Sequence, residues 1–229
     1  MKINFTNFYK SLSDKNKIFN KIKFHIRNNQ FVGGESVVNF ENSFSKFINS
    51  KYCVSLGNGT DALEIAIRSL NLKKNSEVIV PINTWISTAE AVVNCGFKVV
   101  FCDINLNDYT IDTNDLIKKI TQKTSLIIIV HLYGNPCNIS EILKISKKYK
   151  LKIIEDCAQA HGSYYNQKHV GTFADIGTFS FFPGKNLGAF GDGGAIFTNN
   201  DALAGGCSDR RRTVPGSSFL LRWEVDQKR

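Results

Sequence analysis

The chain has 229 residues, 42% of them hydrophobic and only 4 of them proline, so it is long enough to bury one large core. Its formal charge of +9 comes mainly from lysines paired on expected helix faces, without the basic stripe interleaved with aromatics that nucleic-acid binding requires. No apolar run can span a bilayer, and the polar start does not resemble a signal peptide. We therefore expect a soluble, cytoplasmic protein that binds neither nucleic acid nor membranes.

The six cysteines are scattered along the chain without a CxxC pair, and several lie in apolar runs such as VVFCDI. Scattered cysteines in apolar surroundings are typical of buried thiols in a reducing compartment. We predict no metal site and no disulfide.

Hydrophobic periodicity predicts strands and helices that alternate along the chain. After a helical N-terminal segment, residues 1–30, the expected elements are a helix in ESVVNFENSFSKFIN, a strand at 52–56, a helix in DALEIAIRSL, a strand in EVIVP, a helix near 86–94, a strand in KVVFCDI, a helix near 112–120, a strand in SLIIIVHLYG, a helix near 139–149 and a strand in KIIEDC.

Strands that are apolar on both faces and are separated by helices indicate a parallel sheet covered on each side. Toward the C-terminus, TFSFFP and GAIFTNN have strand composition but leave no room for a helix between them, so at least one strand is expected to run antiparallel. The prediction is an α/β fold, a three-layer sandwich with a mostly parallel sheet of about seven strands. It occupies residues 31–204.

Functional sites in such sheets lie beyond the carboxyl ends of the strands. One candidate is GNGTDAL, which places Gly57, Gly59 and Thr60 at the start of a helix, where free N–H groups favour a phosphate. The motif lacks the third glycine of the dinucleotide fingerprint and the Lys-Ser/Thr of a P-loop. A glycine turn with a threonine cap is an ordinary structural alternative.

A second candidate is IIEDCAQAHG, in which Glu155 and Asp156 end a buried strand. Because side chains alternate along a strand, the two carboxylates face opposite sides of the sheet and cannot act as an acid and base pair on one bond. Asp156 can hold a cation or a protonated ring nitrogen, or it can cap a helix.

A third candidate is Lys185, which lies between a proline-glycine corner and a glycine-spaced loop in SFFPGKNLGAFGDGG. Such framing suits an amine that must be held at a fixed point. A lysine amine, an aspartate for a pyridine nitrogen and a phosphate cup are together what pyridoxal phosphate requires.

Four stretches in this order resemble the DegT family of pyridoxal-phosphate-dependent nucleotide-sugar aminotransferases: GNGTDALEIAIRSL, PINTWISTAEAVVNCGFKVVFCDIN, HLYGNPCNISEI and EDCAQAHGSYYNQKHVGTFADIGTFSFFPGKNLGAFGDGGA. The resemblance covers roughly residues 30 to 204. It implies the large, cofactor-binding domain of the type I transferase fold, a homodimer with shared active sites, and transfer of an amino group from a donor such as glutamate to a nucleotide-linked keto sugar. Lipopolysaccharide or O-antigen biosynthesis is the expected setting.

By the same resemblance, Lys185 matches the catalytic Schiff-base lysine and Asp156 the partner of the pyridinium nitrogen. The other matched positions are cofactor contacts, namely Gln159 near the ring and its 3-hydroxyl, Gly59 and Thr60 in the phosphate loop, Ser180 as a further phosphate ligand, and Trp85 as the aromatic residue stacked on the ring. No role is assigned to His131 or His161, which flank the expected pocket.

Lys185 is expected to bind the cofactor and then to move a proton as general acid and base, which requires a lowered pKa. Two alternatives stay open. One is a dehydratase that uses the same cofactor, although family members of that kind carry histidine where this chain has Lys185. The other is a non-catalytic, cofactor-binding remnant.

The resemblance ends before residues 205–229, a predicted atypical tail. The first 204 residues contain 2 arginines and 23 asparagines, whereas the final 25 contain 5 arginines and no asparagine. This shift suggests a different reading frame or a joined sequence, and a natural basic tail is the alternative. We expect the small C-terminal domain of the family to be missing, which would leave the pocket open to water and this chain with little or no transaminase activity.

Overall fold

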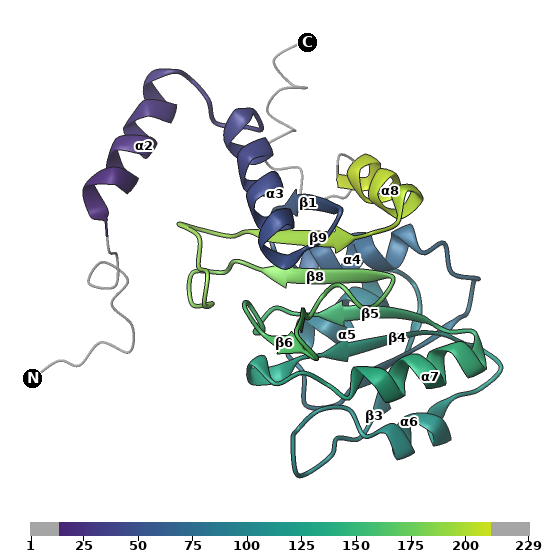
Figure 1. The fold of residues 1–229 in the computed structure, drawn as a ribbon. Helices are drawn as coiled ribbons and strands as arrows, with labels where there is room; N and C mark the ends of the chain where they lie inside the picture. The colour runs from purple at the N-terminus through teal and green to yellow at the C-terminus, as the bar shows by residue number, and fades with distance from the viewer. Residues whose placement is uncertain (1–13, 212–229) are drawn as a thin grey trace, which may run out of the picture. The chain divides into compact units, whose positions relative to one another are not determined.

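A computed structural model describes residues 14–211 (Figure 1), which form two compact units, one up to Phe40 and one from Glu41 onward. In the first unit, α2 (Lys15–Arg27) begins at the cap Asp14, whose carboxylate accepts the N–H of Lys17 at 3.0 Å. Helix α3 (Glu35–Ile48) crosses from the first unit into the second. The predicted N-terminal segment is therefore helical over α2, and its residues 1–13 lie outside the described part.

The second unit contains a seven-stranded sheet in the order β1-β9-β8-β5-β4-β2-β3. Its strands are β1 (Tyr52–Leu56), β2 (Glu77–Pro81), β3 (Lys98–Cys102), β4 (Thr124–Val130), β5 (Lys152–Asp156), β8 (Ile176–Ser180) and β9 (Gly194–Thr198). A separate hairpin pairs β6 (Tyr164–Tyr165) with β7 (Lys168–His169).

The predicted sheet is confirmed, including its mixed direction. Neighbours from β3 across to β8 are parallel, whereas β9 runs antiparallel to both β8 and β1. The antiparallel strand follows from the connection between β8 and β9, which contains no helix, since a parallel crossover usually needs one. Every residue of β2, β8 and β9 is buried, as expected for strands covered on both faces.

Helices cover both faces of this sheet. The helices of the second unit are α4 (Gly59–Ser69), α5 (Ile86–Asn94), α6 (Thr113–Lys119), α7 (Ile139–Tyr149) and α8 (Asp201–Arg211). Figure 1 shows α6 and α7 on one side of the sheet and α4 and α5 on the other, and the buried side chains accordingly form two clusters. The α/β three-layer prediction is confirmed.

One cluster is centred on aromatic rings contributed by α3, β8 and β9. Phe44 is 7% exposed, and its ring contacts those of Phe179, Phe181 and Phe197 edge to face, with centroids 5.2 to 5.6 Å apart. Edge-to-face pairs contribute on the order of 1 kcal/mol beyond area burial. Phe44 is the only phenylalanine of α3 that is buried, since Phe40 is 37% and Phe47 is 50% exposed.

Helix α8 runs through residue 204, where the sequence composition changes. Cys207 is fully buried against α4, and Arg210 donates to the side chain of Asn71 at 3.0 Å. Residues 205–211 of the predicted tail thus pack onto the sheet domain, while residues 212–229 lie outside the described part. Within residues 14–211, no helix has both the length and the apolar character needed to cross a membrane.

Candidate functional site

Five loops meet at the edge of the sheet where the parallel strands have their carboxyl ends. Because β9 is antiparallel to β8, the loop between them returns to the same edge, and β1 also ends there beside the start of β9. The loops are those after β1, β2, β4, β5 and β8, and all seven predicted site residues lie in these loops or in the strand ends and helix start that adjoin them. The topology therefore brings together segments that the sequence separates widely.

Asp156 is the last residue of β5 and is 5% exposed. One carboxylate oxygen accepts the Thr88 hydroxyl at 3.0 Å, and the other accepts the N–H of Ala158 at 3.1 Å. Burial raises the pKa of Asp156, and these two hydrogen bonds together with the charges of Lys185 and His131 act in the opposite direction. No helix begins directly after β5, so Asp156 has no helix to cap.

The two neighbouring carboxylates point to opposite faces of the sheet, as predicted. Asp156 contacts α5 through Thr88, whereas Glu155 accepts the N–H groups of Phe173 and Ala174, both at 2.8 Å, on the other face. Glu155 therefore holds a loop in place, and Asp156 alone of the pair is available to the candidate site.

Lys185 lies in the loop between β8 and β9 and is half-buried. A tight turn fixes its backbone, since its N–H donates to the Phe182 carbonyl at 2.8 Å. The loop then folds back so closely that a Cβ at Gly188 would lie 2.2 Å from the carbonyl oxygen of Pro183, which explains the glycine at position 188. Burial lowers the pKa of Lys185, and the negative charge of Asp156 opposes this shift.

The start of α4 forms a cradle suited to an anion. Asn58 is the cap, with φ −162°, and its side chain accepts the Asp61 N–H at 2.8 Å, so the helix begins at Gly59 and Thr60 is not the cap. The first N–H groups of a helix have no partner within it. Ser180, at the end of β8, faces this start, and a Cβ at Gly59 would lie 2.7 Å from the Ser180 Cβ.

In the sheet, β4 lies between β5 and β2. Gln159 lies in the loop after β5, and Trp85 lies in the loop after β2. The Gln159 side-chain oxygen accepts the N–H of Tyr133, whose backbone is held in the left-handed region at φ 57°. Trp85 is the residue before α5 and is 71% exposed, so its ring is not part of the core. An exposed indole at the edge of the site is free to lie against a ring-shaped ligand.

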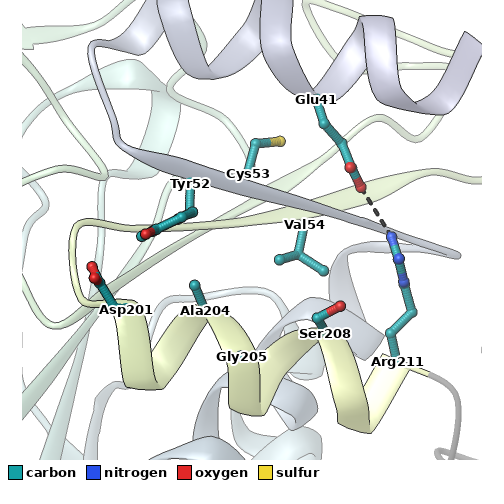
Figure 2. A pocket seen from close by; sticks show the side chains of 9 residues that line it. All are labelled: Glu41, Tyr52, Cys53, Val54, Asp201, Ala204, Gly205, Ser208 and Arg211. Atoms are coloured by element: carbon teal, nitrogen blue, oxygen red, sulfur yellow. Dashed lines mark hydrogen bonds and ion pairs between the residues drawn. The ribbon is translucent and has the colours of Figure 1, made fainter. Parts of the chain in front are cut away.

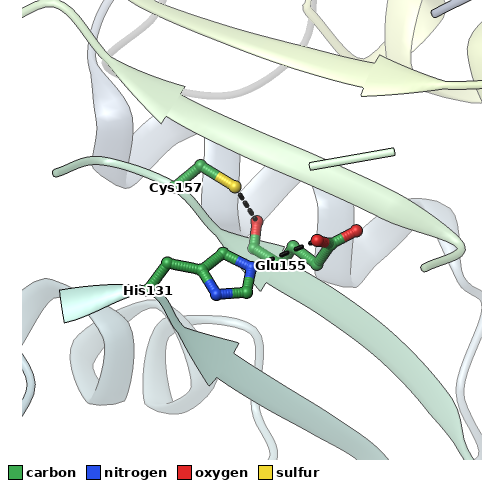
Figure 3. Close-up of side chains that lie close together, drawn as sticks. All are labelled: His131, Glu155 and Cys157. Carbon is green, nitrogen blue, oxygen red and sulfur yellow. Dashed lines mark hydrogen bonds and ion pairs between the residues drawn. The ribbon is translucent and has the colours of Figure 1, made fainter. Parts of the chain in front are cut away.

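A buried group beside the site, made of His131, Glu155 and Cys157, has the composition of a metal centre (Figure 3). Their potential ligand atoms lie within 4.8 Å of one another. The His131 Nδ1, however, accepts the Cys137 N–H at 3.1 Å, which leaves the proton on Nε2 to be donated to Glu155 at 3.1 Å. These hydrogen bonds already use both ring nitrogens of His131, so neither nitrogen is left for a metal ion. The three residues instead join β4 to β5 and to the loop that follows β5.

Glu155 is the centre of that network. Burial alone would raise its pKa, but hydrogen bonds from His131 and from the N–H groups of Gly171 and Ala174 leave the pKa below its usual value. With these hydrogen bonds, the Glu155 carboxylate fixes the loop that leads into β8.

His161 packs between aromatic rings behind the site. Its ring centroid lies 5.4 Å from those of Phe179 and Phe181, and neither ring nitrogen makes a hydrogen bond of normal geometry, although the Ser180 backbone is close. Burial lowers the pKa of His161 to about 4, so the ring is neutral at pH 7.

A hollow at the far edge of the sheet contains none of the predicted site residues. It lies between β1 and α8, next to the ion pair in which Arg211 contacts Glu41 at 2.9 Å (Figure 2). Its separation from the loops described above leaves it outside the candidate site.

Sequence reasoning gave no role to three residues that support the site: Thr88, which bonds Asp156, Thr84, which bonds Thr88, and Asn58, which caps α4. The hydroxyls of Thr84 and Thr88 lie 2.9 Å apart, and Thr88 bonds Asp156. The spacing of the two threonines by four residues, across the start of a helix, was the available signal. It indicates only that the two side chains are neighbours, and does not reveal that they face β5.

Known proteins resemble this chain in sequence and in fold. Residues 12–213 match the DegT/DnrJ/EryC1/StrS aminotransferase family, so the chain belongs to that family. It is 46% identical over 173 residues to dTDP-3-amino-3,6-dideoxy-alpha-D-galactopyranose transaminase of Aneurinibacillus thermoaerophilus, covering 76% of this chain and 47% of the relative. The chain spans about half the length of the curated relatives that it matches.

Two solved structures are similar to the described fold. DesV of S. venezuelae, in complex with a ketimine intermediate, has a TM-score of 0.87 at 30% identity, covering 95% of this chain and 59% of that one. E. coli GDP-4-keto-6-deoxy-D-mannose-3-dehydratase, with bound hydrated PLP, has a TM-score of 0.79 at 32% identity, covering 84% of this chain and 51% of that one. The fold is therefore shared with a protein named as a dehydratase, whereas curated relatives are named as transaminases.

Proposed function

We propose that this chain carries the pyridoxal-phosphate site of an aminotransferase that acts on a nucleotide-linked keto sugar. The observation that carries the proposal is the meeting of Lys185, Asp156 and the α4 cradle at one edge of the sheet. The charge of Asp156 acts on Lys185, and Ser180 touches Gly59. Amine, carboxylate and anion cradle are the three elements that this cofactor needs.

The residues present fit the cofactor. The N–H groups at the start of α4 and the Ser180 hydroxyl would hold its phosphate, and the absence of a Cβ at Gly59 lets Ser180 approach the helix start. Asp156 would hold a proton on the ring nitrogen, Gln159 would lie near the 3-hydroxyl, and Trp85 would stack on the ring. When bound, the cofactor supplies an electron sink for the substrate carbon that carries the amino group.

Lys185 is suited to two tasks in this site. Its amine would bind the cofactor covalently until the amino donor displaces it, and the freed amine would then move a proton between the substrate carbon and the cofactor. Both tasks require a neutral amine, which burial favours by lowering the lysine pKa. Lys185 also favours transamination over the dehydration named for the E. coli neighbour, since we expect dehydratases of the family to carry histidine there.

The amino donor, the sugar and the assembly go beyond the site itself. We propose glutamate as donor and a homodimer as the assembly, with the expected cytoplasmic location and a setting in amino-sugar biosynthesis. Exposed apolar side chains at the site edge, among them Ile86 at 67% and Tyr133 at 79%, are compatible with a second copy covering that edge.

Cofactor attachment is the first test. The protein is incubated with pyridoxal phosphate, reduced with borohydride and digested, and we expect mass spectrometry to find the cofactor on the peptide containing Lys185. Lys185→Ala should lose the adduct, while Lys73→Ala, at an exposed lysine outside the site, should retain it. An adduct that persists in Lys185→Ala would contradict the assignment.

The reaction is tested with glutamate and a panel of nucleotide-linked keto sugars. The assay uses this chain and, in parallel, this chain joined to the C-terminal half of a relative. An amino sugar supports the proposal, loss of a hydroxyl supports a dehydratase, and cofactor binding without product from either protein supports a non-catalytic role.

A further inference from the structure

Two buried threonine hydroxyls form a chain that ends on Asp156. Thr88 lies in the first turn of α5 and is 1% exposed; its hydroxyl donates to the Asp156 carboxylate at 3.0 Å. The Thr84 hydroxyl lies 2.9 Å from that of Thr88. A hydroxyl has one proton, so with Thr88 donating to Asp156, Thr84 must be the donor to Thr88.

Both hydroxyl dipoles in this chain therefore point toward the carboxylate. Hydrogen bonds in series polarise one another, so the second donor strengthens the first. A hydrogen bond to an ionised group is stronger than one between neutral groups, and it favours the charged form. The chain thus offsets part of the cost of burying Asp156.

The same contacts also orient the carboxylate. Thr88 holds one oxygen and the Ala158 N–H holds the other, which fixes the carboxylate plane and leaves each oxygen free to accept one more hydrogen bond. Asp156 interacts electrostatically with three other titratable groups, Lys185, His131 and Cys157. Of these, Lys185 comes from the loop across the site.

We propose that Thr88, oriented by Thr84, is a positioning residue that keeps Asp156 ionised and aims it at the ring nitrogen of the bound cofactor. This inference rests on the proposed function for the cofactor, but its effect on Asp156 is a property of the chain alone. The two parts are therefore tested separately.

The first measurement is made without cofactor. The Asp156 carboxyl is titrated by carbon-13 NMR in the wild-type protein, Thr88→Val and Thr88→Ser. Removing the donor should raise the pKa of Asp156 in Thr88→Val, and the retained hydroxyl of Thr88→Ser should restore it. Thr84→Val should give a smaller rise in the same direction, and offers a second variant if Thr88→Val does not fold.

The control is Thr198→Val. Thr198 is 4% exposed and its hydroxyl donates to the Asp175 carbonyl at 2.8 Å, at the opposite edge of the sheet. The substitution Thr198→Val removes a comparable buried hydroxyl, so it should lower the free energy of unfolding without changing the pKa of Asp156. An Asp156 pKa that is the same in the wild-type protein, Thr88→Val and Thr84→Val would overturn the proposal.

The second measurement is cofactor affinity. Loss of one hydrogen bond to a charged group should weaken pyridoxal-phosphate binding about tenfold to a hundredfold in Thr88→Val, with most of it recovered in Thr88→Ser. If the wild-type protein does not bind the cofactor, the proposed function fails while the titration still decides the role of Thr88. If the wild-type protein binds and Thr88→Val weakens binding no more than Thr198→Val, the positioning role is wrong and the proposed function stands.

Discussion

The contact between Gly59 and Ser180 allows the phosphate cradle to be tested by a double-mutant cycle. A Cβ added at Gly59 would lie 2.7 Å from the Ser180 Cβ, closer than two such atoms approach, and 3.1 Å from its Oγ, which is a tight contact. The start of α4 or the end of β8 must therefore shift. Overpacking of this kind costs about 1 to 3 kcal/mol, so we expect Gly59→Ala to lower the free energy of unfolding by that amount.

Ser180→Gly should relieve the clash, because it removes both close atoms and leaves the Ser180 Cα at 3.4 Å, an ordinary contact. On its own, this substitution costs about 0.5 to 1 kcal/mol for a glycine within a strand. In the double variant the alanine methyl has room, so the two costs should not add. The expected coupling energy is about 1 to 3 kcal/mol in favour of the double variant.

Urea unfolding gives the stabilities, and titration with pyridoxal phosphate gives the affinities. Stability should recover in the double variant, whereas affinity should not, because the hydroxyl is gone. The control is Gly205→Ala in α8, where an added Cβ meets nothing within 4 Å and should stabilise the helix by about 0.5 to 1 kcal/mol. The reasoning is refuted if Gly59→Ala is as stable as Gly205→Ala, or if the costs of the two substitutions simply add.

Two further predictions use other residues of the site. Trp85→Ala should change the free energy of unfolding by no more than about 0.5 kcal/mol, since the side chain is 71% exposed, yet weaken cofactor binding; equal affinity by titration would remove the stacking role. His161 stays neutral in the folded protein down to a pKa of about 4, whereas the unfolded chain takes up a proton near pH 6.5. Stability should therefore fall as pH falls from about 6.5 to about 4, and His161→Phe should flatten that slope in unfolding curves measured across this range; an unchanged slope would contradict the assignment.

Much of the fold could be predicted from the sequence because the signals are local. Runs such as EVIVP and LIIIV are apolar on both faces, and the helices between them have clear periods. The lack of a helix between the last two strands correctly indicated an antiparallel strand. What could not be predicted was the order of strands, in which β9 inserts between β1 and β8, because pairing depends on contacts distant in the sequence.

The candidate site was predicted at the level of residue type and strand end. Lys185, Asp156 and Gly59 stand out because glycines or strand ends frame them. The residues that hold these side chains in place could not be predicted, because Thr88 bonds Asp156 only when α5 packs on the sheet. The alternative that Thr60 caps the helix is wrong, because the cap is Asn58, whose extended backbone brings its side chain to the Asp61 N–H.

The place of β9 in the sheet has a consequence for the order of folding. Strand β1, the first in the chain, pairs with β9, the last, and has no other partner among the described strands. It can therefore join the sheet only after β9 is in place. Closing so long a loop is entropically costly and slow. The loop after β1 leads directly into α4, and β9 is preceded by the Lys185 loop. The anion cradle and the lysine should therefore become ordered in the same late step, after the parallel strands have assembled.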